Sequence, residues 1–224
     1  MIKNILNLGD AALYCDFGQD VNKETNSSVI KYFNKIQKLK IESINNITPS
    51  YNKLIISFDL KKIKYAELKD IIEKIQIDKE DSFKTKIIEI PICCEEPYSL
   101  DFTRLEEKLQ LSKEQIIKNF FNKKYFCYMT GFIAGMPFLG DLNENMRTQR
   151  LETPRVKVPK GSIGITEQFA NIYTFESPGG WNIIGNTPIK VFDNSREDMP
   201  NLINPGDTVI FKEISKEKYL NYVQ

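Results

Sequence analysis

The chain has 224 residues, of which 41% are hydrophobic and 27% are charged, and 31 basic residues against 30 acidic ones leave a net charge of +1. This balance is not typical of a protein that binds nucleic acid or a membrane surface. No apolar run approaches the ~20 residues that cross a bilayer, and the polar N-terminal segment is not typical of a signal peptide. We therefore expect a cytoplasmic protein.

Histidine and cysteine usage narrows the possible chemistry. The chain contains no histidine, which excludes an imidazole base, a Ser-His-Asp relay and a histidine-ligated metal within it. Acid–base work must therefore use Asp, Glu, Lys, Tyr or Cys, or residues of a partner. The four cysteines form no CxxC pair, and we interpret them as reduced thiols of the core. We expect no metal site in this chain.

The first 83 residues alternate strand-like and helix-like segments. Apolar runs on both sides of Gly9 and Asp10 predict a hairpin. One helical face is predicted at Val29, Tyr32, Phe33, Ile36 and Leu39. Extended segments at 42–47 and Lys53–Asp59 follow, and a second helical stripe comprises Leu68, Ile71, Ile72 and Ile75. This ββαββα order predicts a small α+β domain over residues 1–83, with its boundary near Asp78–Ser82.

Residues 84–224 begin with a strand-like segment at Thr85–Cys93 and two helices. Asp101 is the predicted N-cap of the first helix. Ser112 and Gln115 form a capping box that predicts the start of the second. From Tyr125 onward the chain becomes β in character, with turn signals at short intervals, which predicts a barrel or sandwich.

The segment Ser177–Gly180 has the proline and glycine of a type II turn, in which a central glycine takes a positive φ. Its predicted arms are the strands Ile172–Glu176 and Trp181–Ile184. As a lone motif, Phe175–Trp181 is either a tight hairpin with a core tryptophan or an active site. In the second case Glu176 is a candidate base, and the turn amides are candidate oxyanion donors.

Two further segments have both a structural and a functional interpretation. Glycines interrupt the apolar run Tyr128–Gly140, which is either a structural kink or the wall of a pocket. Arg155, with Arg147 and Arg150 upstream, either lies in a solvated loop or uses its planar fork to bind a carboxylate or phosphate.

Taken together, these motifs resemble the family of 5-oxoprolinase B subunits, also called the KipI or allophanate hydrolase subunit 1 family. The matching segments span nearly the whole chain: Gly9–Leu13, Gly131-Phe132, Leu151–Arg155, Val158–Ile165, Phe175–Trp181, Ile184–Pro188 and Pro205–Asp207. The resemblance implies an α+β fold, with a small N-terminal α/β sandwich domain followed by a C-terminal cyclophilin-like β-barrel domain.

The resemblance also implies a reaction and partners. Members work with the A and C subunits of the oxoprolinase, and with ATP as co-substrate of the complex they hydrolyse 5-oxoproline to L-glutamate. A lactam is a stabilised amide, so its activation needs cationic and amide donors around oxygen. The implied catalytic residues are Glu176 and Arg155. Residues implied to bind substrate or nucleotide are Thr153, Ser177, Gly179, Gly180, Trp181, Gly131, Phe132 and Gly135.

The sequence departs from the family pattern at three places. Relatives carry a histidine near the position of Phe120, a Pro-Gly-Phe-Pro-Tyr loop where this chain has Ala134–Phe138, and a glycine-containing run where it has Thr166–Asn171. The protein is therefore either weakened in catalysis, while the C subunit supplies the chemistry, or adapted to another substrate. Two alternatives remain: an inhibitor that binds a sporulation histidine kinase, and a cyclophilin-like binding module without a catalytic association.

Overall fold

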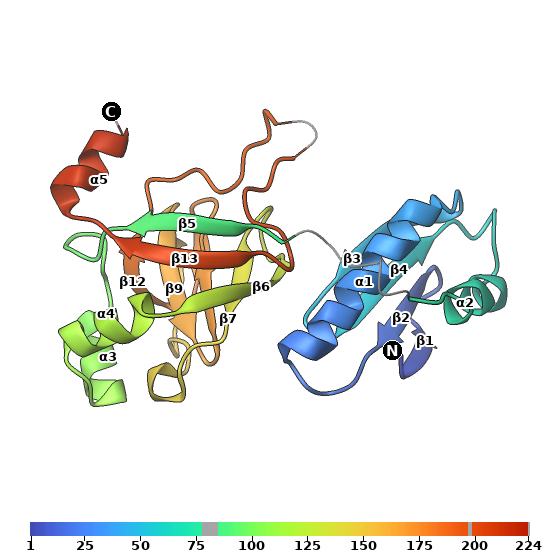
Figure 1. Cartoon of the computed structure of the whole chain (residues 1–224), viewed down its shortest axis with the longest axis horizontal. Coiled ribbons are helices and arrows are strands. Elements are labelled where there is room, and N and C mark those ends of the chain that lie inside the picture. Colours follow the sequence, from blue (N-terminus) through green and yellow to red (C-terminus); the bar gives the residue numbers. More distant parts are fainter. Residues whose placement is uncertain (78–84, 197–198, 224) are drawn as a thin grey trace. The chain divides into compact units, whose positions relative to one another are not determined.

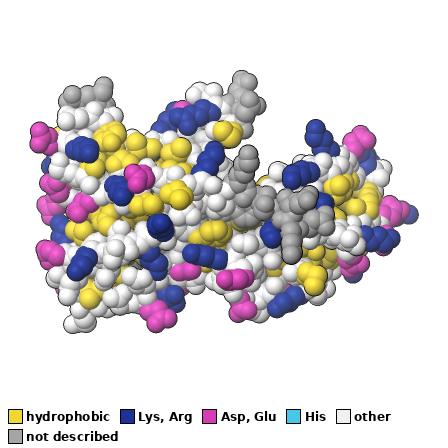
Figure 2. All heavy atoms as spheres, viewed as in Figure 1, with side chains coloured by type: hydrophobic (Ala, Val, Ile, Leu, Met, Phe, Trp, Pro, Cys, Tyr) yellow, Lys and Arg dark blue, Asp and Glu magenta, His cyan; other side chains and the backbone are white. Residues whose placement is uncertain are grey.

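The computed structural model describes residues 1–77, 85–196 and 199–223. The chain divides into two compact units, Met1–Lys84 and Thr85–Gln224. The boundary predicted at Asp78–Ser82 lies outside the described residues. Within the described ranges, no helix is both long and apolar enough to span a membrane. Basic and acidic side chains are interspersed on the surface that Figure 2 displays.

The N-terminal unit is an antiparallel sheet with two helices (Figure 1). Its elements are β1 (Asn4–Asn7), β2 (Ala12–Asp16), α1 (Lys23–Leu39), β3 (Ile44–Pro49), β4 (Lys53–Phe58) and α2 (Tyr65–Glu73). The order of strands across the sheet is β1-β2-β4-β3. Hydrophobic residues of both helices and the sheet form one core. The predicted hairpin is confirmed, because β1 pairs antiparallel with β2 around Gly9.

Helix α1 begins at an N-cap, Asn22, whose side-chain oxygen accepts a hydrogen bond of 2.9 Å from the Thr25 amide. Three residues of its predicted apolar face, Val29, Tyr32 and Ile36, are buried as expected. Leu39 was expected on the same buried face but is exposed. The reason is its place in the last turn, where the chain leaves the sheet at Lys40 with a φ of 49°.

The C-terminal unit contains a curled seven-stranded sheet with the strand order β12-β9-β10-β7-β6-β13-β5. Its elements are β5 (Ile87–Ile92), α3 (Phe102–Leu109), α4 (Lys113–Phe121), β6 (Lys124–Thr130), β7 (Pro137–Gly140), the 3₁₀ helix η2 (Glu144–Met146), β8 (Arg155–Val158), β9 (Ser162–Thr166), β10 (Phe169–Ile172), β11 (Ser177–Gly179), β12 (Asn182–Asn186), β13 (Thr208–Glu213) and α5 (Lys216–Val223). Strand β13 pairs parallel with β5, and the other pairs of this sheet are antiparallel. Residues of α3 and α4, including Leu105 and Phe120, pack with the inner face of the sheet in one large core.

The two outer strands of this sheet meet at one end. The Cys93 amide donates to the Asn186 carbonyl at 2.9 Å, and the Asn186 amide donates to the Cys93 carbonyl at 3.0 Å. Gly185 allows this approach, because a Cβ there would lie 2.7 Å from the Cys93 carbonyl oxygen. The unit is therefore a mixed α/β half-barrel. The two outer strands of its sheet are joined by these hydrogen bonds at one end.

Of the local predictions in this unit, the turn at Ser177–Gly180 was wrong and the two helix starts are confirmed in position. Asp101 is the N-cap residue of α3, as predicted, but its side chain makes no capping hydrogen bond, because its carboxylate binds elsewhere. Ser177–Gly180 is not a type II turn: Ser177–Gly179 is extended and pairs with β8, and neither glycine has a positive φ. The predicted arms do not pair with each other, since β10 and β12 flank β9 on opposite sides. The capping box of Ser112 and Gln115 is present as predicted.

We predict that Gly185→Ala lowers the free energy of unfolding by about 1–3 kcal/mol, because the new methyl group would meet backbone rather than a flexible side chain. Gly131→Ala is the matched control, since its methyl group would meet only the flexible end of Met129. The measurement is urea denaturation of both variants. Equal stability of the two proteins would contradict the tight closure of the sheet.

All four cysteines are free and buried, as predicted. Burial raises the pKa of the Cys15 thiol to about 12, and it also raises the pKa of Cys94 and Cys127. Thiolates therefore form first in the unfolded chain, where the pKa is about 8.5. The unfolded state then binds fewer protons, so the free energy of unfolding falls as pH rises above that value.

This linkage predicts that Cys15→Ala makes the free energy of unfolding fall less steeply between about pH 8 and pH 10, because one buried thiol is removed. Denaturation curves of the wild type and the variant at several pH values provide the measurement. An unchanged slope would show that Cys15 is not held protonated by burial.

Candidate functional site

The predicted site segments come together on a two-stranded ribbon that stands apart from the large sheet. Strand β11 pairs antiparallel with β8, with Ser177 opposite Val158 and Gly179 opposite Arg155. The register shifts between Ser177 and Gly179, which marks a bulge. Two predicted site residues that are distant in the sequence, Arg155 and Gly179, are therefore direct neighbours.

Arg155 is held by a buried carboxylate. Its Nη2 atom donates to Asp101 Oδ1 at 2.5 Å. The other carboxylate oxygen, Oδ2, accepts a hydrogen bond of 2.6 Å from the Ile183 amide, and the Asp101 amide donates to the Ile183 carbonyl at 3.1 Å. Asp101 therefore connects Arg155 to strand β12. Sequence analysis missed this role, because a helix N-cap already accounted for an aspartate at that position.

Two polar atoms of the ribbon are buried without a hydrogen-bond partner among the described residues. They are Nη1 of Arg155 and Oγ of Ser177. A buried donor without an acceptor costs free energy, more so when it is charged. A ligand oxygen or an ordered water would satisfy these groups. Both residues were predicted as site residues from the sequence.

Tyr173 lies at the candidate site, and sequence analysis did not single it out. Its side chain is buried, and its hydroxyl abuts the α-carbon of Gly179, so a side chain at Gly179 would collide with it. Burial raises the pKa of the phenol, while the Asn171 side chain, the Trp181 amide and the positive charges of Arg155 and Arg150 oppose that rise. The sequence gives no signal for this contact, because five residues separate Tyr173 from Gly179 and only the fold brings the two together.

The predicted glycine-rich loop between β6 and β7 is tied to the segment that leads into β11. The Thr174 hydroxyl donates to the Ala134 carbonyl at 2.7 Å. Gly135 has a φ of 68°, and a Cβ there would overlap the ring of Phe192. Phe132, also in this loop, has a φ of 69°. Its side chain is 70% exposed and therefore does not pack into the core. The positive φ and the close packing of Gly135 therefore account for a glycine at that position, whereas Gly131 has no positive φ and its amide donates to the Met136 carbonyl at 3.0 Å across this loop.

The remaining predicted residues occupy different positions. Glu176 forms an exposed ion pair of 3.0 Å with Lys157, so the two predicted catalytic residues have separate partners. Thr153 is exposed. Trp181 is half-buried and packs edge-on against Phe138, with 5.6 Å between ring centroids. Phe120, where relatives carry a histidine, stacks on Phe211 in the core.

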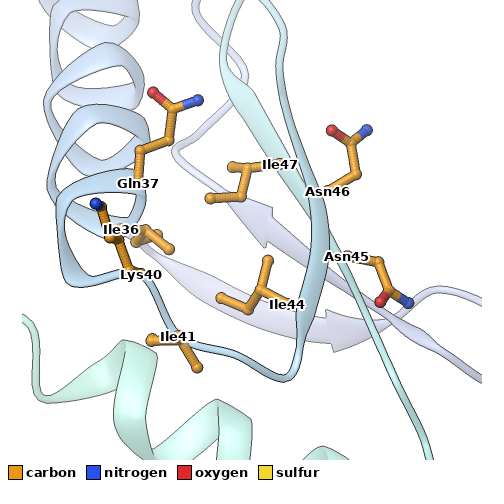
Figure 3. A pocket seen from close by; sticks show the side chains of 8 residues that line it. All are labelled: Ile36, Gln37, Lys40, Ile41, Ile44, Asn45, Asn46 and Ile47. Carbon is orange, nitrogen blue, oxygen red and sulfur yellow. The ribbon is translucent and has the colours of Figure 1, made fainter.

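A hollow of about 220 Å³ also lies in the N-terminal unit, between the end of α1 and strand β3 (Figure 3). Its lining residues are Ile36, Gln37, Lys40, Ile41, Ile44, Asn45, Asn46 and Ile47. In Figure 3, Ile36, Ile44 and Ile47 face the space between helix and strand, while Asn45 and Asn46 point away from the helix. This lining offers no acid, thiol or hydroxyl, so the ribbon of the C-terminal unit is the better candidate. Over the described stretches of the chain, no cluster of three or more acidic or cysteine side chains is suited to a metal ion.

Comparison with known proteins identifies the family. The family model of the carboxyltransferase domain, subdomain C and D, matches residues 3–203. The B subunit of 5-oxoprolinase from Bacillus subtilis (strain 168) is 30% identical over 96% of this chain and 94% of its own length. The protein of the same name from Haemophilus influenzae is 31% identical over 93% of this chain and 96% of its own length.

A solved structure agrees with this assignment. The crystal structure of TTHA0988 superposes with a TM-score of 0.81 at 26% identity, over 91% of this chain, and the chain spans 40% of that protein. The chain is therefore a carboxyltransferase-type α/β domain protein. Within that class it belongs to the family of 5-oxoprolinase B subunits, as its motifs predicted.

The adjacent glycines of the ribbon give a matched pair of variants. We predict that Gly179→Ala lowers the free energy of unfolding by about 1–3 kcal/mol, because its methyl group would collide with the Tyr173 hydroxyl. Gly180→Ala should be tolerated, since the nearest atoms to its methyl group lie 3.5 Å or more away. Denaturation followed by Trp181 fluorescence measures both. A larger effect of Gly180→Ala would contradict this packing.

Proposed function

We propose that the chain is one component of an ATP-dependent amidohydrolase assembly that converts 5-oxoproline, ATP and water into L-glutamate, ADP and phosphate. The A and C subunits of the oxoprolinase are the proposed partners, and the isolated chain is inactive. The proposal is supported by two relatives, both named as B subunits of 5-oxoprolinase, which match this chain over nearly their full length. The observation that carries it is the buried, unsatisfied Nη1 donor of Arg155 beside the double glycine.

The proposed site suits a ligand oxygen that carries or gains negative charge, such as an oxygen of the substrate carboxylate or of phosphate. Arg155 and the Ser177 hydroxyl are donors whose positions are fixed by the ribbon, and such donors stabilise charge that develops in a transition state. Tyr173, with its pKa raised by burial, keeps its proton at neutral pH and is a further donor. Glu176 remains a proposed proton acceptor, and its pairing with Lys157 keeps it on the exposed side of the ribbon.

The first experiment isolates the tagged protein from its native cells and identifies the proteins that co-elute in stoichiometric amounts. We expect homologues of the A and C subunits. The reconstituted assembly should then hydrolyse ATP only when 5-oxoproline is added. A histidine kinase as the partner, or no partner, would contradict the proposal and favour the inhibitor or the stand-alone binding module.

In the reconstituted assembly, we predict that Arg155→Ala lowers kcat/KM for 5-oxoproline by roughly 10²–10³-fold, the usual cost of losing one oxyanion donor. Arg196→Ala is the matched control, because Arg196 is an exposed arginine that pairs only loosely with Asp193 at 3.9 Å. Its activity should equal that of the wild type. Equal activity of Arg155→Ala and the control would rule out the proposed role of Arg155.

A further inference from the structure

The side chain of Asp101 does not cap helix α3, although the residue stands at the N-cap position. It directly precedes α3, where an aspartate usually caps the first turn of a helix and stabilises it. Its carboxylate instead points to the ribbon and to strand β12, and the residue is only 5% exposed. The start of α3 therefore lacks a side-chain cap from this residue.

The alternative use of Asp101 is not explained by stability alone. A buried ion pair loses the hydration of both charges, and its net contribution to folding is often close to zero. What the pair does provide is geometry. Asp101 is fixed to Ile183 through both its amide and its carboxylate, and it holds one nitrogen of the Arg155 fork at 2.5 Å. The guanidinium is planar, so fixing Nη2 also restricts where Nη1 can point.

We propose that Asp101 is the positioning residue of an oxyanion subsite, and that it holds Arg155 so that Nη1 binds a carboxylate or phosphate oxygen of the ligand. This inference deepens the proposed function and rests on the same site. The hydroxyl of Ser177 is the second unsatisfied donor of the ribbon. A second cation lies near, since a Cβ on Gly180 would be 3.5 Å from the Nε atom of Arg150.

The chain carries its own reporter for this subsite. Trp181 is its only tryptophan, and it lies between Gly180 and the first residue of β12. A ligand that binds beside the ribbon should change the fluorescence of this residue. Fluorescence titration of the 224-residue chain therefore measures binding without any partner protein or turnover.

The titration uses three probes: 5-oxoproline, inorganic phosphate and 2-pyrrolidinone. The last is the same lactam without a carboxylate. We expect 2-pyrrolidinone to bind at least tenfold more weakly than the anionic probe that the subsite prefers. Preference for 5-oxoproline assigns the subsite to the substrate carboxylate, and preference for phosphate assigns it to the nucleotide or the phosphate product.

Asp101→Asn tests the positioning role, because the asparagine can still accept from the Ile183 amide but no longer carries a charge for Arg155. We expect the Kd for the preferred anion to rise roughly tenfold to hundredfold, as for the loss of a charged hydrogen bond. The Kd for 2-pyrrolidinone should not change. Arg155→Lys, which keeps the charge but loses the fork, should weaken anion binding as well.

A double-mutant cycle separates positioning from a purely structural role. If Asp101 acts through Arg155, then Asp101→Asn should weaken anion binding no further in a chain that already carries Arg155→Ala. A fall in melting temperature with an unchanged anion Kd would overturn the proposal. So would equal binding of all three probes, or no binding of either anion to the wild type. Anion binding without lactam hydrolysis by the assembly would refute the proposed function but leave the subsite intact.

Discussion

The pairing of Cys93 with Asn186 is the constraint on which the C-terminal unit depends. It joins the end of β5 to the end of β12 and thereby fixes the curvature of the whole sheet. Asn186 reinforces the junction, because its side chain donates to the Lys160 carbonyl and accepts from the Tyr219 hydroxyl of α5. Strand β12 is thus held at Asn186 by its pairing with Cys93 and at Ile183 by the hydrogen bonds of Asp101.

The site uses the opposite face of the strands that build the core. Along β9 and β10, Ile163, Ile165, Ala170 and Ile172 point into the main core. The intervening residues face the other side, where the Gly164 amide donates to the Asn171 side chain at 3.1 Å. A smaller cluster that includes Val158 and Tyr173 covers this second face. The period-two alternation of the strands therefore separates packing from polar chemistry.

Local features could be predicted from the sequence, and long-range ones could not. The hairpin at Gly9 and the capping box at Ser112 depend on residues a few positions apart, so their signals are complete in the sequence. The pair of Asp101 and Arg155 joins residues 54 positions apart, and no local pattern encodes it. Ser177–Gly179 has turn residues but forms a strand, because β8 offers a pairing partner that local propensity does not reveal.

The uncapped start of α3 has a consequence for how this protein can evolve. If the side chain at position 101 capped α3, the helix would be more stable. An apolar residue in place of Ser177 would remove a buried hydroxyl that has no hydrogen-bond partner. The site is therefore where added stability is easiest to obtain. Each such change would also alter the group that meets the ligand. Selection for a more robust fold and selection for ligand recognition therefore act in opposite directions at the same few residues, and heat-adapted relatives should gain stability elsewhere in the chain.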